Sequence, residues 1–149
     1  MTTSDSYLES KFPYLKQTGY KLTSPASIDY NCFAWAAGDN KRCWDPFSYY
    51  WPGGLPREHS LATFIKLYES LGYEVCSNHQ LETGYEKIAL YVDDQGLPSH
   101  AAKQLRSGLW SSKLGQNKDI QHKLDGLMGT VYGKVAKILK KALKKSIQK

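Results

Sequence analysis

The chain of 149 residues carries a formal net charge of +6 at pH 7, with 41% hydrophobic and 23% charged residues. This length is typical of one domain with its own core, and the three cysteines include no CxxC pair, which argues against a disulfide-stapled secreted scaffold. No run of about 18 apolar residues predicts a membrane span, and the N-terminus lacks the charged start and apolar core of a Sec signal. We therefore expect a single domain over residues 1–149, either cytoplasmic or delivered by a secretion system that needs no signal peptide.

Three segments are predicted in the first third of the chain. Residues 1–25 predict an N-terminal arm laid over the core and ending at Pro25, because the residue before a proline is disfavoured in a helix. Residues 32–38 suit a short helix that begins at Cys32 and stops at Gly38. The stretch "KRCWDPFSYYWPGGLP" mixes aromatic residues with prolines and glycines, so it predicts a long ordered loop.

A second helix is predicted between Ser60, its N-cap, and Gly72, its C-cap. Apolar residues recur on one helical face at Leu61, Phe64, Ile65, Tyr68 and Leu71. Residues 85–114 then contain short strand-like runs separated by turn sequences, which is typical of an antiparallel meander. Together these patterns predict an α+β fold.

Residues 129–149 predict a C-terminal amphipathic basic helix. Apolar residues fall on one predicted side, at Val131, Val135, Ile138 and Leu139, and lysines fall on the other. Such lysines either remain solvated or attract an acidic protein partner or inhibitor, and both readings stay open. No stacking aromatic residues alternate with them, which argues against nucleic acid as a partner.

The cysteine at the start of the short helix is the main candidate for chemistry. A helix N-terminus favours a thiolate, and its free N–H groups together with the Asn31 side chain can hold an oxyanion. The base would be a histidine from elsewhere, and His100, which opens a predicted strand, is the best placed; His122 is its rival. The alternative reading is that Cys32 is a buried structural thiol, as we expect for Cys43 and Cys76.

The motifs "YNCFAWAAGD", "YYWPGGLPRE", "GYEKIALYVDDQGLPSHAAKQL", "GLWSSKLG" and "DIQH" resemble an uncharacterised bacterial family over roughly residues 12–135. Its Cys and His motifs are similar to those of papain-like cysteine peptidases, and the first motif is also similar to the start of CHAP-type cell-wall amidases. The resemblance implies a papain-like arrangement, with the helix carrying Cys32 packed on a small antiparallel sheet carrying His100. It also implies a thiol nucleophile at Cys32 and a general base at His100.

Papain-like enzymes use a third polar residue, on the strand after the histidine, to orient the imidazole. Here that strand reads "GLWSSKLGQNKD" and has no Asn or Asp at its centre, which leaves Ser112, Asp119 and Gln104 as candidates. A two-residue turn at residues 106–107 would make Ser111 rather than Ser112 face the His100 side of the sheet.

The resemblance implies a thiol-dependent hydrolase or transferase that acts on an amide bond of a protein or peptide substrate, without cofactor or metal. Small papain-like domains also serve bacteria as toxins, so a toxin or effector is a further expectation. Three residues of the aromatic loop either line a substrate cleft or cap the core, namely Trp44, Tyr50 and Trp51. The alternative function is a non-catalytic binding module that uses the aromatic loop and the basic C-terminal helix.

Overall fold

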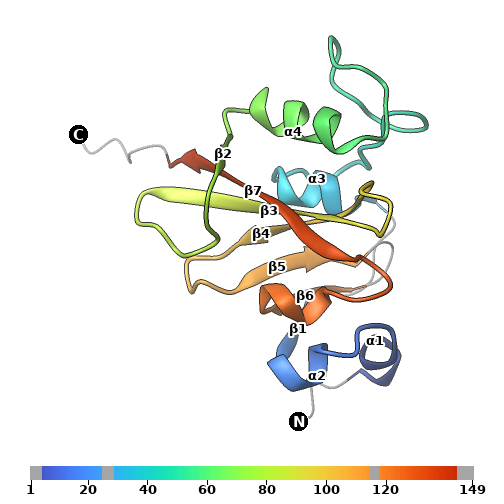
Figure 1. Cartoon of the computed structure of the whole chain (residues 1–149), viewed down its shortest axis with the longest axis vertical. Coiled ribbons are helices and arrows are strands. Elements are labelled where there is room, and N and C mark those ends of the chain that lie inside the picture. The colour runs from blue at the N-terminus through green and yellow to red at the C-terminus, as the bar shows by residue number, and fades with distance from the viewer. Residues whose placement is uncertain (1–4, 25–28, 115–117, 144–149) are drawn as a thin grey trace.

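Seven β-strands form the centre of the computed structural model, which describes residues 5–24, 29–114 and 118–143 (Figure 1). They make one open antiparallel sheet with the order β1-β6-β5-β4-β3-β7-β2. The strands are β1 (Tyr20–Ser24), β2 (Glu74–Cys76), β3 (Tyr85–Val92), β4 (Pro98–Gln104), β5 (Trp110–Lys113), β6 (Asp119–His122) and β7 (Lys134–Ala142). The expected meander is confirmed, because β3, β4, β5 and β6 follow one another in both chain and sheet.

Short helices cover both faces of this sheet. They are α1 (Ser6–Lys11), α2 (Leu15–Thr18), α3 (Cys32–Ala36), α4 (Leu61–Glu69) and the 3-10 helix η1 (Leu124–Leu127). α3 and α4 lie on one side, and α1, α2 and η1 lie on the other (Figure 1). The expected α+β class is thereby confirmed.

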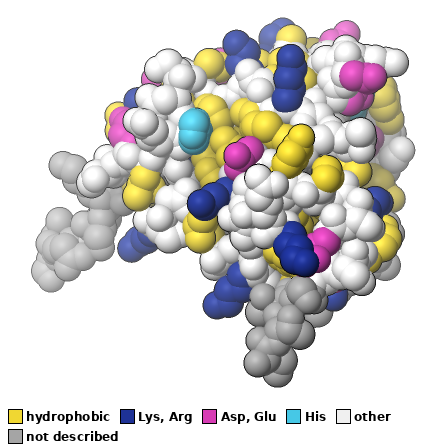
Figure 2. Space-filling view, turned by 60° about the horizontal axis from the view of Figure 1, so that its bottom comes forward, with side chains coloured by type: hydrophobic (Ala, Val, Ile, Leu, Met, Phe, Trp, Pro, Cys, Tyr) yellow, Lys and Arg dark blue, Asp and Glu magenta, His cyan; other side chains and the backbone are white. Residues whose placement is uncertain are grey.

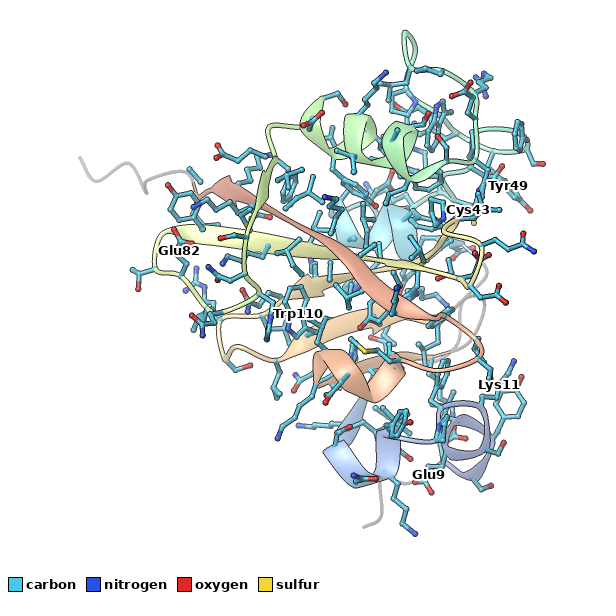
Figure 3. The ribbon with its side chains drawn as sticks, viewed as in Figure 1. Glu9, Lys11, Cys43, Tyr49, Glu82 and Trp110 are labelled. Atoms are coloured by element: carbon cyan, nitrogen blue, oxygen red, sulfur yellow. The ribbon has the colours of Figure 1, made fainter. Side chains whose placement is uncertain are left out.

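The two faces of the sheet carry separate hydrophobic cores, because successive residues of a strand point to opposite faces. The upper core, under α3 and α4, includes Phe33, Phe64, Leu67, Tyr68, Ile88, Leu90, Ala101 and Leu139. The lower core, over α1, α2 and η1, includes Leu8, Phe12, Leu15, Tyr91, Ala102, Trp110, Ile120, Leu127 and Ile138. Figure 3 shows the same division, with Cys43 and Tyr49 on the α3 and α4 side and Glu9 and Lys11 on the opposite side.

Asn31 and Ser60 are the N-caps of α3 and α4, and of the two only Ser60 was predicted as a cap. The Asn31 side chain accepts a hydrogen bond of 3.1 Å from the Ala34 amide, and Ser60 accepts one of 3.2 Å from Thr63. Each bond satisfies a backbone N–H that lacks a partner in the first helical turn. Cys32 is therefore the first residue of α3, as predicted.

A three-residue turn joins β4 to β5, and it decides which serine faces His100. The Leu105 amide donates to the Leu109 carbonyl at 2.8 Å, and Gly108 adopts a positive φ of 92°. Lys103 consequently pairs with Ser111, so Ser111 shares the face of Lys103, and Ser112 points to the other face, with His100. A two-residue turn would have reversed the two serines.

The prediction of a C-terminal helix is wrong. Residues 134–142 form β7, which pairs with β3 on one side and β2 on the other, and residues 144–149 of the predicted helix lie outside the described residues. Ile138 enters the lower core and Leu139 the upper core, with exposed fractions of 8% and 0%. Because both faces of the sheet are covered, β7 buries the consecutive residues Ile138 and Leu139. In the sequence, two adjacent apolar residues also fit the apolar face of an amphipathic helix, which explains the wrong prediction.

The positive charges do not form the predicted basic helical face. Figure 2 shows one face of the molecule, on which Lys and Arg side chains are scattered among hydrophobic ones. Two lysines are engaged with Glu82, since Lys140 Nζ lies 3.1 Å and Lys87 Nζ 3.4 Å from its carboxylate. A binding surface built on a basic C-terminal helix is therefore excluded for the described part of the chain.

The predicted N-terminal arm contains more regular structure than the sequence indicated. Within its described residues it forms α1, α2 and the edge strand β1, which pairs with β6 through Tyr20 and His122. Leu8 and Leu15 are 1% and 0% exposed in the lower core. The arm is thus an integral wall of that core.

Candidate active site

Cys32 lies at the start of α3, where that helix packs on β4 and β5. Its side chain is 7% exposed and belongs to the upper core. The backbone of Ala101 in β4 hydrogen bonds to the sulfur, as do the backbone groups of Phe33 and of Cys32 itself. The sulfur is therefore held between a helix N-terminus and the strand that carries His100.

Burial raises the pKa of the Cys32 thiol to about 12, although the hydrogen bonds from the Ala101, Phe33 and Cys32 backbone and the positive charge of Lys113 act in the opposite direction. Desolvation disfavours the thiolate more than these groups favour it. The helix N-terminus alone therefore does not produce a thiolate. In the described conformation Cys32 is a neutral thiol, which needs a base in order to react.

His100 lies in β4 and is completely buried on the lower face of the sheet. Its ring stacks on Tyr132, with centroids 4.0 Å apart and an interplanar angle of 9°, and meets Tyr91 edge to face at 5.3 Å. Burial and the nearby His122 hold the pKa of His100 well below its usual range. The imidazole is thus neutral at physiological pH, which is the form that can accept a proton.

Cys32 and His100 approach β4 from opposite faces of the sheet. The amide that contacts the Cys32 sulfur belongs to Ala101, the residue directly after His100. His100 Nδ1, the ring nitrogen nearer its own backbone, has no hydrogen-bond partner among the described residues. A negative charge on Cys32 also contributes to raising the pKa of Tyr132, whose ring covers His100. No hydrogen bond joins the sulfur to the free nitrogen among the described residues, and the backbone of β4 lies between the two side chains.

The other ring nitrogen of His100 begins a chain of buried hydrogen bonds. His100 Nε2 lies 2.9 Å from Ser112 Oγ, and Ser112 Oγ lies 2.6 Å from His122 Nε2. His122 Nδ1 lies 2.8 Å from the Lys123 carbonyl oxygen. Ser112 and His122 are 0% and 1% exposed. Of the three candidates for a third residue, Ser112 is the one that contacts His100.

His122 was considered from the sequence only as a rival base, and its place behind Ser112 was missed. It stands opposite Trp110 on the strand next to β5, with its side chain on the face that also holds Ile120. The period-2 pattern of "DIQH" could have shown that Ile120 and His122 share a face. Its contact with Ser112 depended on the register of two turns, which the sequence leaves open.

Asp119 and Gln104 do not contact His100. Asp119 Oδ2 accepts a hydrogen bond of 2.9 Å from the Tyr30 hydroxyl, and burial raises the pKa of its carboxyl group. Gln104 Nε2 donates to the His79 carbonyl at 2.9 Å. Asp119 instead lies opposite Lys113 in the sheet, and the charge of Lys113 acts on both Asp119 and Cys32.

Asn31, the predicted oxyanion donor, ties α3 to the aromatic loop. Its Oδ1 accepts from the amides of Ala34 and Trp44, both at 3.1 Å, and its Nδ2 donates to the Trp44 carbonyl at 2.8 Å. The side chain therefore serves as a structural clamp in the described conformation. The backbone N–H groups at the start of α3 are the donors that lie beside the sulfur.

The aromatic loop divides into buried and exposed side chains. Trp44 and Trp51 are 6% and 4% exposed in the upper core, where their indole N–H groups donate to Asp39 at 2.9 Å and to Pro56 at 3.0 Å. Tyr50 is 36% exposed, with the Arg42 guanidinium 3.5 Å from its ring centroid. The two tryptophans therefore cap the core, and Tyr50 remains accessible.

The described residues offer little support for other kinds of site. In residues 5–24, 29–114 and 118–143, no three His, Cys, Asp or Glu side chains gather as a metal site would require. The same residues form no helix of the length and hydrophobicity that crossing a bilayer would need. Cys43 and Cys76 are half-buried.

Comparison with known proteins places the chain in a family. The domain of unknown function DUF7689 matches residues 21–140, so the chain belongs to that family. No curated protein and no solved structure matches the chain. The matched range reaches from β1 to β7 and includes Cys32, His100, Ser112 and His122. The narrower likeness to papain-like cysteine peptidases stays a prediction.

Proposed function

We propose that this DUF7689 protein is a thiol-dependent hydrolase or transferase of the papain-like type, with Cys32 as nucleophile and His100 as general base. The observation that supports this most directly is the unpartnered, fully buried Nδ1 of His100, in the residue that directly precedes Ala101, whose backbone acts on the Cys32 sulfur. Buried polar atoms nearly always have a partner, and exceptions concentrate at sites that use them. A bare imidazole nitrogen is suited to take the thiol proton once the sulfur and the ring come into contact.

The proposed reaction begins when a substrate carbonyl reaches Cys32. Nδ1 of His100 removes the thiol proton as the sulfur attacks the carbonyl carbon, and a tetrahedral intermediate forms. The backbone N–H groups at the start of α3 stabilise its oxyanion. As the C–N bond breaks, the imidazolium of His100 protonates the leaving amine, and a thioester remains on Cys32. Water then releases the acid, or a second amine accepts the acyl group.

The described conformation is a closed one. Cys32 is 7% exposed, His100 is 0% exposed, and Tyr132 covers the imidazole. A substrate therefore has to displace part of this cover before it reaches the sulfur. The Cys32 thiol and the His100 ring, which lie on opposite faces of β4, also have to come within hydrogen-bond distance before the proton passes. Lids and loops that open for substrate are common in enzymes, so burial of the pair is compatible with the proposal.

The proposal is tested by alkylation of the folded protein with iodoacetamide at pH 7.5, with the Cys32 peptide quantified by mass spectrometry. We expect His100→Gln to slow alkylation of Cys32 at least about tenfold, because a positioned base contributes about 10²–10⁴-fold to such steps. Cys76, on β2, is the internal control and should react equally in both proteins. Equal alkylation of Cys32 in wild type and His100→Gln would contradict the proposal.

A second candidate function, a binding module without chemistry, is supported by the exposed aromatic residues of the loop. Phe47 and Tyr49 are 67% and 61% exposed, well above what a side chain used only for packing needs. Figure 3 shows Tyr49 pointing away from the sheet. Replacement of both residues by serine should abolish partner binding if this function holds, while leaving alkylation of Cys32 unchanged.

A further inference from the structure

The hydrogen-bond chain behind His100 has a direction, which follows from its last member. The Lys123 carbonyl can only accept, so His122 Nδ1, 2.8 Å away, carries the proton. Burial lowers the pKa of His122 to about 4, so this histidine is neutral at physiological pH and its Nε2 carries a lone pair. The second histidine is thereby fixed as one tautomer.

The tautomer of His122 fixes which hydrogen bond Ser112 donates and which it accepts. Nε2 of His122, 2.6 Å from Ser112 Oγ, accepts the only hydroxyl proton of that serine. Ser112 Oγ then accepts from its other neighbour, His100 Nε2, at 2.9 Å. A neutral imidazole has one N–H, so Nδ1 of His100 is left as the bare nitrogen, and it is the atom without a partner.

We propose that His122 is a positioning residue, which acts through Ser112 to hold His100 in the tautomer whose Nδ1 is free to accept a proton. This inference rests on the proposed function of Cys32 and His100, but its structural content is separate. The opposite tautomer would place the proton on Nδ1, and that nitrogen could then accept no proton from the thiol. Two neutral residues thus perform the orienting task that a carboxamide or carboxylate performs in other enzymes of this type.

The packing around the chain supports this assignment. His100 and Ser112 are both 0% exposed and His122 is 1% exposed, so no bulk water competes for their hydrogen bonds. Tyr132 and Tyr91 enclose the His100 ring, and the Tyr91 hydroxyl is occupied by the Leu124 carbonyl at 2.7 Å. In a dry site a reversed chain would leave the Lys123 carbonyl facing a bare nitrogen, which carries a substantial penalty.

The test combines tautomer detection with alkylation of Cys32. Two-bond ¹H–¹⁵N correlation spectra of ¹⁵N-histidine-labelled protein at pH 7.5 distinguish an Nε2–H ring from an Nδ1–H ring. We expect Nε2–H for His100 and Nδ1–H for His122 in wild type, with signals assigned from their loss in His100→Gln and His122→Gln. An Nδ1–H signal from wild-type His100 would overturn the proposal whatever the reactivity of Cys32.

Variants of the chain supply the second measurement. His122→Phe keeps a ring but removes the acceptor, and Ser112→Ala removes the link; each should give His100 a mixture of tautomers and slow alkylation of Cys32 about tenfold or more. His122→Gln retains an acceptor oxygen for Ser112 and should keep most of the rate. Unchanged tautomer and rate in the folded Ser112→Ala protein would overturn the proposal, and this smaller change decides the matter if His122→Phe does not fold.

The two proposals fail in different ways. If the expected tautomers are found but His100→Gln leaves Cys32 alkylation unchanged, the catalytic pair is contradicted and the tautomer assignment stands. If His100→Gln slows alkylation but Ser112→Ala and His122→Phe do not, the pair stands and the positioning role of His122 is contradicted.

Discussion

The ring of Tyr132 lies flat on the ring of His100, with centroids 4.0 Å apart and an angle of 9° between the planes. Tyr132 comes from the turn between η1 and β7, and the turn is closed by two hydrogen bonds between Gly129 and Gly133, at 2.8 and 2.9 Å. Ser99 of β4 adds a hydrogen bond from its hydroxyl to the Tyr132 carbonyl. A short turn thus covers the base of the proposed site.

Removal of this cover should change the titration of His100. In Tyr132→Ala, water reaches the imidazole, so the desolvation that lowers its pKa is relieved and we expect the pKa to rise toward the ordinary histidine value. NMR titration of the labelled histidines measures this directly. Tyr49→Ala, which removes a 61% exposed tyrosine of the aromatic loop, is the control and should leave the His100 pKa unchanged. An unaltered titration in Tyr132→Ala would show that other groups keep the ring dry.

The turn itself depends on a glycine. Gly133 has a φ of 78°, and a Cβ at this position would lie 1.9 Å from the Val92 carbonyl oxygen. Gly133→Ala should therefore destabilise the protein by more than the roughly 1 kcal/mol expected from backbone strain alone. Gly96→Ala is a matched control, since Gly96 has a φ of 80° but open space around its Cβ position. Urea unfolding compares the two, and equal losses would argue against the contact with Val92.

Acid should weaken the fold through its buried histidines. The pKa of His122 is about 4 in the folded protein and near 6.5 when unfolded, so between these values the unfolded state binds more protons. Its contribution to stability is complete above pH 6.5 and decreases as the pH falls toward 4, by about 3 kcal/mol in total. The lowered pKa of His100 acts in the same direction.

Urea unfolding between pH 4.5 and 7.5 measures this dependence. His122→Gln cannot take up the proton, so its stability should depend less on pH, by up to one proton per molecule. His79→Gln is the control, because His79 is exposed. Parallel curves for wild type and His122→Gln would contradict the assignment.

The strand nature of β7 predicts a contrast between two positions two residues apart. Leu139 is 0% exposed in the upper core, and Leu139→Ala should lower the free energy of unfolding by about 2–5 kcal/mol. Lys137 in the same strand is exposed, so Lys137→Ala should stay within about 0.5 kcal/mol of wild type. Thermal or urea denaturation checks both, and a large loss at Lys137 would mean that its stem covers apolar surface.

The sequence predicted the elements whose signals are local. The apolar spacing and N-cap of α4, the start of α3 at Cys32 and the order of the meander all follow from residues close together in the chain. β7 was assigned wrongly because Ile138 and Leu139 are buried on opposite faces, which no single-sided pattern describes. β1 was missed because its residues alternate half-buried and exposed at the sheet edge, a weak signal.

The candidate site could be predicted only in part for the same reason. The sequence motifs identify Cys32, His100 and Ser112 as candidates. Which of Ser111 and Ser112 faces His100 depends on whether the turn at Gly108 has two or three residues. His122 joins the site through that register and the register of the next strand pair, Trp110 with His122. Each turn of uncertain length doubles the number of possible strand registers. The hydrogen bonds from His100 through Ser112 to His122 could therefore be identified only in the folded structure.

The placement of Cys32 and His100 on opposite faces of β4 makes the strand a partition between two independently packed compartments. Cys32 packs with α3, α4 and the tryptophans of the aromatic loop, and His100 packs on the side of α1, α2, η1 and the turn at Tyr132. A substitution deep in either compartment can shift one partner without disturbing the other. Loss of reactivity should therefore map to residues on both sides of the sheet, many of them remote from any bound substrate.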